Sequence, residues 1–181
     1  MGYVLLLTGK PGVGKSTIIQ EVCKRIQDPY RGFYTGEIRE NGRRSGFSIT
    51  TFSGQQSILS STQFVSENYP KVGSYGVSIE NINKTIVNEI NIALREKCPL
   101  VVVDEIGKME MLSNEYKSSI MNLFKSDAIV FGTILENHHR FGDTIKKMSN
   151  VNLVTITYEN RNSMVHEILE ILEKHSIHVN H

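Results

Sequence analysis

Short runs rich in apolar residues alternate along the chain with segments whose apolar residues recur every three or four positions. Runs of the first kind are typical of strands buried inside a sheet, and segments of the second kind are typical of amphipathic helices. The predicted strands are Val4–Leu7, Leu100–Val103, Ala128–Phe131 and Val151–Ile156. The first predicted helix has its apolar face between Ile18 and Ile26 and is expected to end at Pro29. The other predicted helices are Ile82–Glu96, Tyr116–Phe124, Arg140–Met148 and Met164–Leu172.

A different pattern occupies the region between the first two helices. Strands are predicted over Gly32–Ile38 and Arg44–Phe52, and Asn41-Gly42 between them accepts the positive φ angles of a tight hairpin turn. Residues 53–71 are rich in Ser, Gln and Thr without periodicity, so they are expected to form a long surface loop. A further short strand is predicted over Tyr75–Ile79.

Together these elements predict an α/β fold of three layers. Apolar strands that alternate with amphipathic helices favour a mostly parallel sheet covered on both faces, and the antiparallel hairpin is an insertion into it. The length of 181 residues corresponds to a single domain spanning 1–181.

A glycine-rich segment follows the first predicted strand directly and opens the first helix. It reads Gly9-Lys10-Pro11-Gly12-Val13-Gly14-Lys15-Ser16 and matches the phosphate-binding loop (P-loop) pattern G-x-x-x-x-G-K-[ST] without a gap. The glycines let the backbone curl with its N–H groups pointing inward, and the helix N-terminus adds partial positive charge. The segment therefore predicts binding of a nucleoside triphosphate.

Each polar side chain of this loop has an expected role. Lys15 supplies a positive charge to the β- and γ-phosphates, and the Ser16 hydroxyl is a hard oxygen ligand suited to Mg²⁺. Thr17 can add a hydroxyl contact to the α-phosphate.

Two acidic residues end the apolar strand Leu100–Val103. Asp104, at the carboxyl end of a buried parallel strand, is expected to complete the Mg²⁺ site that Ser16 begins. Glu105 is expected to face another way and to deprotonate an attacking water. The alternative is an acidic pair that is merely solvated or caps a helix.

Three basic residues are candidates for stabilising the charge that develops on the γ-phosphate. Arg39 and Arg44 lie on the predicted hairpin, and Lys108 follows the acidic pair. For the arginines, the alternative is solvation or pairing with Glu37 and Glu40.

Asn160-Arg161 follows the last predicted strand, at a junction that often lies beside the base in folds of this kind. Arg161 could stack on the ring and Asn160 could hydrogen-bond its edge. The alternative is a helix start capped by Asn160 or Asn162.

Charge and cysteine content narrow the class of protein. The 20 Lys and Arg residues balance 19 Asp and Glu residues, which disfavours a protein that coats nucleic acid. Two cysteines cannot form a disulfide framework, and the longest apolar runs are far too short to span a bilayer. We expect a cytoplasmic protein with no membrane or nucleic-acid partner, acting as a monomer.

Several segments together resemble the small nucleoside-triphosphatase family first described from thermophiles, also called cancer-related nucleoside-triphosphatases. They are the P-loop, residues 32–39 with 41–47, the block Val103-Asp-Glu-Ile-Gly-Lys-Met-Glu110, and Glu159-Asn-Arg-Asn162. The resemblance implies a P-loop nucleoside-triphosphatase fold and Mg²⁺-dependent hydrolysis of ATP, GTP and other nucleoside triphosphates. It also implies phosphate and metal binding by Lys15, Ser16 and Thr17, with Asp104 and Glu105 as the acidic pair.

Other functions share the P-loop. A small nucleotide or metabolite kinase needs a second pocket under an arginine-bearing lid, and residues 53–71 contain no arginine. A regulatory or RNA-associated nucleoside-triphosphatase would need an aromatic and basic surface that the sequence does not indicate. A binding module without turnover remains a further alternative.

Overall fold

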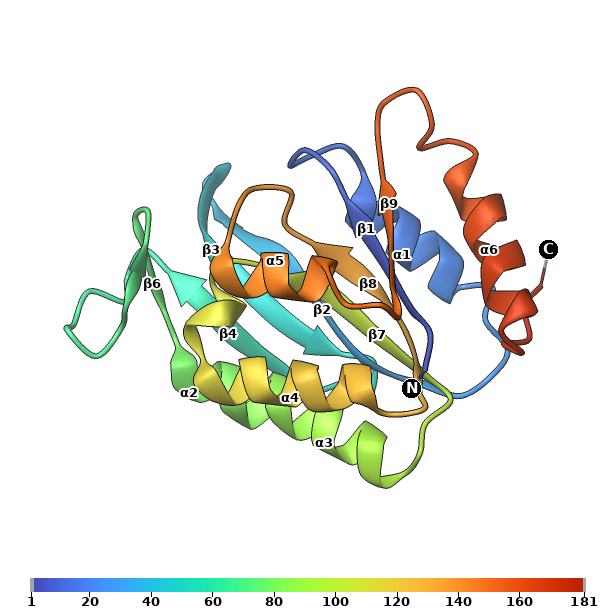
Figure 1. Cartoon of the computed structure of the whole chain (residues 1–181). Coiled ribbons are helices and arrows are strands. Elements are labelled where there is room, and N and C mark those ends of the chain that lie inside the picture. The colour runs from blue at the N-terminus through green and yellow to red at the C-terminus, as the bar shows by residue number, and fades with distance from the viewer. Residues whose placement is uncertain (1, 181) are drawn as a thin grey trace.

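The computed structural model describes residues 2–180 and contains one nine-stranded sheet (Figure 1). Its strands lie in the order β5-β6-β4-β3-β2-β7-β8-β1-β9. The five that pair in parallel are β1 (Val4–Thr8), β2 (Tyr30–Glu40), β7 (Leu100–Ile106), β8 (Ile129–Ile134) and β9 (Val151–Thr155). The antiparallel part adds β3 (Arg43–Thr51), β4 (Gln56–Ser61), β5 (Lys71–Val72) and β6 (Tyr75–Val77).

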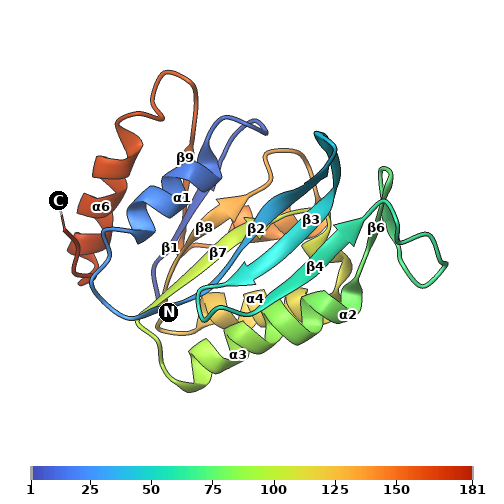
Figure 2. The same ribbon diagram turned by 180° about the vertical axis from the view of Figure 1, so that it is seen from behind.

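Helices cover both faces of the parallel strands (Figure 2). On one face lie α1 (Lys15–Cys23) and α6 (Met164–Lys174). On the other lie α4 (Asn114–Lys125), α5 (Arg140–Lys146) and a continuous helical stretch that consists of α2 (Ile79–Asn81), a π-helical segment (Ile82–Val87) and α3 (Asn88–Arg95). The predicted three-layer α/β fold with its five helices is therefore confirmed, although α1 already ends at Cys23, ahead of Pro29.

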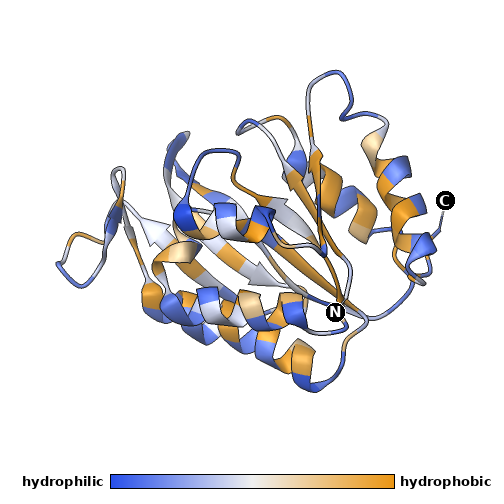
Figure 3. Ribbon diagram, viewed as in Figure 1, coloured by the Kyte–Doolittle hydropathy of each residue, from blue (hydrophilic) through white to orange (hydrophobic). Residues whose placement is uncertain are grey.

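The alternation of side chains along the central strands explains the two cores. In β1, Val4 and Leu6 pack with α3 and α4, while Leu5 and Leu7 pack with α1 and α6, and all four are fully buried. Successive strand residues point to opposite faces, so a strand covered on both sides must be apolar at every position. Figure 3 shows this as continuous hydrophobic colouring along the middle strands.

The antiparallel part confirms one prediction and corrects another. Strands β2 and β3 form the expected hairpin, and its turn residues Asn41 and Gly42 have φ values of 50° and 77°. The prediction of a loop over residues 53–71 is wrong for Gln56–Ser61, which form β4. Only Leu59 and Ser60 of β4 are buried, so its mainly polar sequence carries little of the apolar signal that reveals a strand.

Within the described residues, no helix has both the length and the apolar character that crossing a bilayer would require.

Candidate active site

The P-loop joins β1 to α1 and depends on glycine. Gly9, Gly12 and Gly14 have φ values of 139°, 77° and 110°, a region that side chains disfavour. At Gly9 there is also no room, because a Cβ atom would lie 2.4 Å from the carbonyl oxygen of Ile156. The sequence thus lets the backbone curl just where β9 ends beside it.

Lys15 is the first residue of α1, and its side chain folds back over the loop. Its Nζ donates hydrogen bonds to the carbonyl oxygens of Gly9 at 2.7 Å and Lys10 at 3.1 Å. Val13, whose side chain is buried, donates its backbone N–H to the Lys10 carbonyl at 3.2 Å. The loop therefore holds an ammonium group at the place where the sequence predicts the β- and γ-phosphates.

Asp104 is buried near the carboxyl end of β7, one strand away from β1 across β8. Burial raises the pKa of its carboxyl group, whereas hydrogen bonds from Thr133 and Ser16 and the charge of Lys15 lower it. The Thr133 hydroxyl donates to Oδ1 at 2.6 Å, while Oδ2 is buried without a hydrogen-bond partner among the described residues. The fold thus brings together Ser16 and Asp104, as the sequence predicts, and leaves one carboxylate oxygen available.

Glu105 and Glu110 approach each other across Gly107. A Cβ atom at Gly107 would lie 2.6 Å from Oε1 of Glu105 and 2.7 Å from Oε2 of Glu110, so a larger residue there would push one or both carboxyl groups aside. The fully buried Tyr116 donates its hydroxyl to the backbone oxygen of Glu105 at 3.1 Å, and the peptide bond between Asp104 and Glu105 is cis. Nothing in the sequence indicates this cis bond.

The electrostatics of the carboxyl groups follow from burial. Burial raises the pKa of Glu105, the negative charge of Asp104 raises it further, and Lys15 lowers it. Burial also raises the pKa of Glu110 to about 8, with a further contribution from Glu105. Glu110 therefore holds its proton at neutral pH and can donate a hydrogen bond, while Glu105 is a stronger base than an exposed glutamate.

The raised pKa of Glu110 predicts a pH-dependent stability. The unfolded chain loses this proton near pH 4.5, whereas the folded protein keeps it to about pH 8. Stability contributed by this group is full below pH 4.5 and is lost as pH rises to about 8, at up to about 1.4 kcal/mol per pH unit. We expect the free energy of unfolding in urea to fall between pH 5.5 and 8, and Glu110→Gln to flatten that fall by about 1 to 3 kcal/mol.

The exposed Glu115 provides the control for this measurement. Its replacement by glutamine, Glu115→Gln, should leave the slope of unfolding free energy against pH as in the unchanged protein. An unchanged slope in Glu110→Gln would show that Glu110 does not retain its proton in the folded state.

A cavity of about 360 Å³ runs along the P-loop toward the hairpin. Its lining includes Lys15, Ser16, Thr17 and Glu105, together with Glu37 from β2. The two predicted hairpin arginines both form ion pairs with this glutamate: Arg39 at 2.7 Å, and Arg44 from the neighbouring strand. Arg39 and Arg44 are therefore paired with Glu37, the alternative that the sequence left open, and Glu37 lines this cavity whereas the two arginines do not.

The other end of the P-loop borders a cavity of about 310 Å³ that includes Gly14, Thr17 and Arg161. The Arg161 guanidinium lies 5.2 Å from the centre of the Tyr158 ring, and its Nη1 donates to the Val13 carbonyl at 3.5 Å. The neighbouring Asn160 uses its amide within its own loop, accepting from the Thr157 N–H at 2.8 Å and donating to the Thr155 carbonyl at 2.9 Å. Arg161 thus faces the cavity, and Asn160 shapes the turn that presents it.

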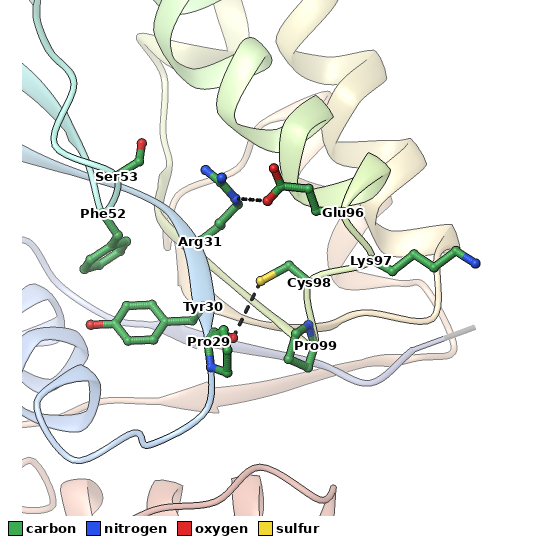
Figure 4. Close-up of a pocket in the computed structure, with 9 residues that line it drawn as sticks. All are labelled: Pro29, Tyr30, Arg31, Phe52, Ser53, Glu96, Lys97, Cys98 and Pro99. Atoms are coloured by element: carbon green, nitrogen blue, oxygen red, sulfur yellow. Dashed lines mark hydrogen bonds and ion pairs between the residues drawn. The ribbon is translucent and has the colours of Figure 1, made fainter.

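A further cavity, of about 490 Å³, lies at the opposite end of the parallel strands, where β2 and β7 begin (Figure 4). Across it the Arg31 Nε donates to Glu96 at 2.7 Å, and Arg31 also pairs with the buried Glu89 at 3.3 Å. Lys97 points away from the other labelled side chains. The Arg31 charge is already paired, so this cavity lacks the free anion-binding groups of the P-loop.

Sequence reasoning missed Thr133, Tyr116 and Glu110. Thr133 has a detectable signal, because it is a polar residue near the carboxyl end of a buried strand, the same position that identified Asp104. Glu110 lies between Met109 and Met111 and is the first residue of a short 3-10 helix, Glu110–Leu112, in which Glu110 and Met111 are buried. No local sequence pattern indicates that burial. Lys108, by contrast, is exposed at the edge of this region.

Comparison with known proteins identifies what the chain is similar to. A family model described as NTPase matches residues 4–169. The nucleoside-triphosphatase THEP1 of Thermotoga sp. (strain RQ2) is 38% identical over 169 residues, covering 93% of this chain and 95% of that protein. The cancer-related nucleoside-triphosphatase homolog of Mus musculus is 31% identical over 186 residues, covering 96% and 98%. The crystal structure of THEP1 from Aquifex aeolicus superimposes with a TM-score of 0.84 at 31% identity, covering 96% and 99%.

Proposed function

Because the chain belongs to the NTPase family and is an enzyme that hydrolyses nucleoside triphosphates, we propose that it converts ATP, GTP, CTP and UTP to diphosphate and phosphate with Mg²⁺. The names of its relatives support hydrolysis rather than transfer to an acceptor. The observation that carries the proposal is the meeting of the P-loop residues Lys15 and Ser16 with Asp104, which lies far along the chain.

In the proposed mechanism, the P-loop grips the triphosphate. Inward-facing backbone N–H groups and the N-terminus of α1 bind the phosphate oxygens, and Lys15 exchanges its contacts with Gly9 and Lys10 for the β- and γ-phosphates. The ammonium then stabilises the negative charge that develops on the transferred group.

Glu105 acts as the general base. It accepts a proton from a water molecule as the water oxygen bonds to the γ-phosphorus and the bond from that phosphorus to the bridging oxygen breaks. Its raised pKa makes it a better proton acceptor, and the hydroxyl of Tyr116 holds its backbone in place. Glu110, on the other side of Gly107, can hydrogen-bond the base.

The residues at the end of β7 fit a magnesium ion. Oδ2 of Asp104 is a buried oxygen without a partner among the described residues, and the Ser16 hydroxyl is close to the same carboxylate. Both are hard oxygen ligands of the kind Mg²⁺ prefers, together with substrate phosphates. When bound, the ion would neutralise charge on the β- and γ-phosphate oxygens.

We assign the base to the cavity beside Arg161. A guanidinium plane held over Tyr158 can stack on any nucleobase, and stacking reads little of the base edge. This supports a permissive enzyme that accepts all four bases.

The test is phosphate release from each of the four nucleotides with Mg²⁺ and no added acceptor. We expect all four to be hydrolysed with KM values within about tenfold of each other, since stacking discriminates weakly. We also expect Asp104→Asn to raise the Mg²⁺ concentration needed for half-maximal rate by roughly tenfold or more.

Asp28→Asn is the matched control, because Asp28 pairs with His178 away from the P-loop. Its Mg²⁺ requirement should equal that of the unchanged protein. Phosphate release that depends on an added alcohol or nucleoside monophosphate would contradict the proposal.

We further propose that the enzyme acts as a monomer in the cytoplasm, without nucleic acid. The formal net charge of +1 supports the absence of a polyanion partner, and the two free buried cysteines, Cys23 and Cys98, are compatible with a reducing compartment.

A further inference from the structure

A cavity of about 340 Å³ lies next to Lys15 and Glu105, on the side away from Arg161. Its acidic end consists of Glu105 and the buried Glu110, and Lys108 and Glu136 stand exposed at its edge. Most of its remaining wall is apolar and comes from Phe47, Leu59, Val72, Met109 and Leu135.

This cavity is larger and more apolar than hydrolysis requires. One attacking water occupies about 30 Å³, so the space would hold roughly ten waters. Apolar side chains do not bind or orient water. A concave, mainly apolar space of this size with a few convergent polar groups is typical of a small-molecule site.

Part of the apolar wall is formed by side chains of the antiparallel strands, and other side chains hold them in place. Phe47 of β3 is held by an edge-on contact with the Tyr75 ring at 5.4 Å between centroids, and the Arg44 guanidinium lies 5.4 Å from its ring centre. Leu59 of β4 is only 2% exposed. The strands beyond β2, which the P-loop itself does not need, therefore supply one side of this cavity.

The acidic end determines which head group fits. Carboxyl oxygens of Glu105 and Glu110 both lie close to Gly107, and they can accept hydrogen bonds from a hydroxyl or an ammonium. Lys15 also lines the cavity, but its ammonium already donates to the carbonyl oxygens of Gly9 and Lys10. An anionic head would therefore face the Glu105 carboxylate, which disfavours it. The opposite charges of Lys108 and Glu136 at the edge offset each other.

We propose that this cavity is a second ligand site, for a small molecule with an apolar body and a head that donates hydrogen bonds, and that its occupant slows hydrolysis by displacing the water beside Glu105. The inhibitory part rests on the proposed function, in which Glu105 activates that water. The binding part rests on the cavity alone.

The test uses 2-phenylethanol as the probe, with 2-phenylethylamine and phenylacetate as matched cationic and anionic probes. Binding is read from the methyl resonances of Leu59, Val72, Met109 and Leu135 in selectively labelled protein. We expect the alcohol and the amine to shift these resonances with Kd values of about a millimolar, as suits a fragment-sized ligand, and phenylacetate to bind at least about tenfold more weakly. In phosphate release, the two binding probes should lower kcat and leave KM for ATP unchanged.

Two variants narrow the cavity at different places. If one of them fails to fold, the other still tests the proposal. Val72→Phe and Leu135→Phe should each weaken binding of 2-phenylethanol at least about tenfold, because both side chains are partly buried in the wall. Val65→Phe makes the same change at a valine that is 74% exposed and outside the cavity, so it should bind the probe as the unchanged protein does.

Several results would overturn the proposal. The first is that the methyl resonances do not shift at high concentrations of 2-phenylethanol. The second is that phenylacetate binds as tightly as 2-phenylethanol, and the third is that 2-phenylethanol becomes phosphorylated. Hydrolysis of ATP without any methyl shift would overturn this proposal and leave the proposed function standing. Methyl shifts in a protein that releases no phosphate would support the ligand site and overturn the proposed function instead.

Discussion

Lys15→Ala is expected to lower phosphate release from ATP by at least about 100-fold and to weaken nucleotide binding. The loop already holds the ammonium over its own carbonyl groups, at 2.7 Å from Gly9 and 3.1 Å from Lys10, so this charge is in place before the substrate arrives. Without it, the β- and γ-phosphates lose their nearest side-chain cation. The measurement is steady-state phosphate release, with nucleotide affinity from calorimetry.

Two variants separate the loss of this charge from other effects. Lys15→Arg should remain strongly impaired, because a planar guanidinium cannot replace a compact ammonium inside the curled loop. Lys24→Ala removes an exposed lysine at the end of the same helix, where it pairs with Glu21, and should keep full activity. A Lys15→Ala rate within tenfold of the unchanged protein would mean that the loop does not bind the reacting phosphates.

Glu105→Gln is expected to lower kcat by about 10²- to 10⁴-fold while nucleotide affinity changes little. The amide has nearly the same shape as the carboxyl group, so the side chain can occupy the same place beside Gly107 and Glu110. The amide cannot, however, accept the proton from water. The measurement is a single-turnover rate beside a binding isotherm for the same nucleotide.

Glu170→Gln is the control for this change, since Glu170 is exposed on α6 and pairs with His166 at 3.2 Å. It should match the unchanged protein in both rate and affinity. If Glu105→Gln retained its kcat, the base would have to be another group, although the P-loop would still bind nucleotide.

The sequence predicts the centre of this fold well because local rules govern it. A run such as Leu100–Val103, apolar at every position, can only be buried on both faces, and the glycines of the P-loop are needed for positive φ values at three positions. These rules also place Asp104 and Ser16 near each other, since Asp104 lies near the carboxyl end of β7 and Ser16 comes after the carboxyl end of β1 in the same parallel part of the sheet.

What the sequence does not predict depends on partners distant in the chain. Strand β4 exists because β3 pairs with it, and its own residues alternate too weakly to reveal it. The burial of Glu110 follows from its position against Glu105 and Tyr116, which no local pattern encodes. Asn160 shows the same limit, because its amide is taken up by its own loop rather than being free for a base.

The position of β1 between β8 and β9 has a consequence for biosynthesis. Strand β1 pairs with segments that leave the ribosome much later than it does, at residues 129–134 and 151–155. Until those emerge, the nascent chain must leave Val4–Thr8 without its neighbours, and the glycine-rich turn after it has no framework to hold its shape. The nascent chain therefore gains its affinity for nucleotide only after β8 and β9 have been made, so nucleotide cannot assist the folding steps that come before them.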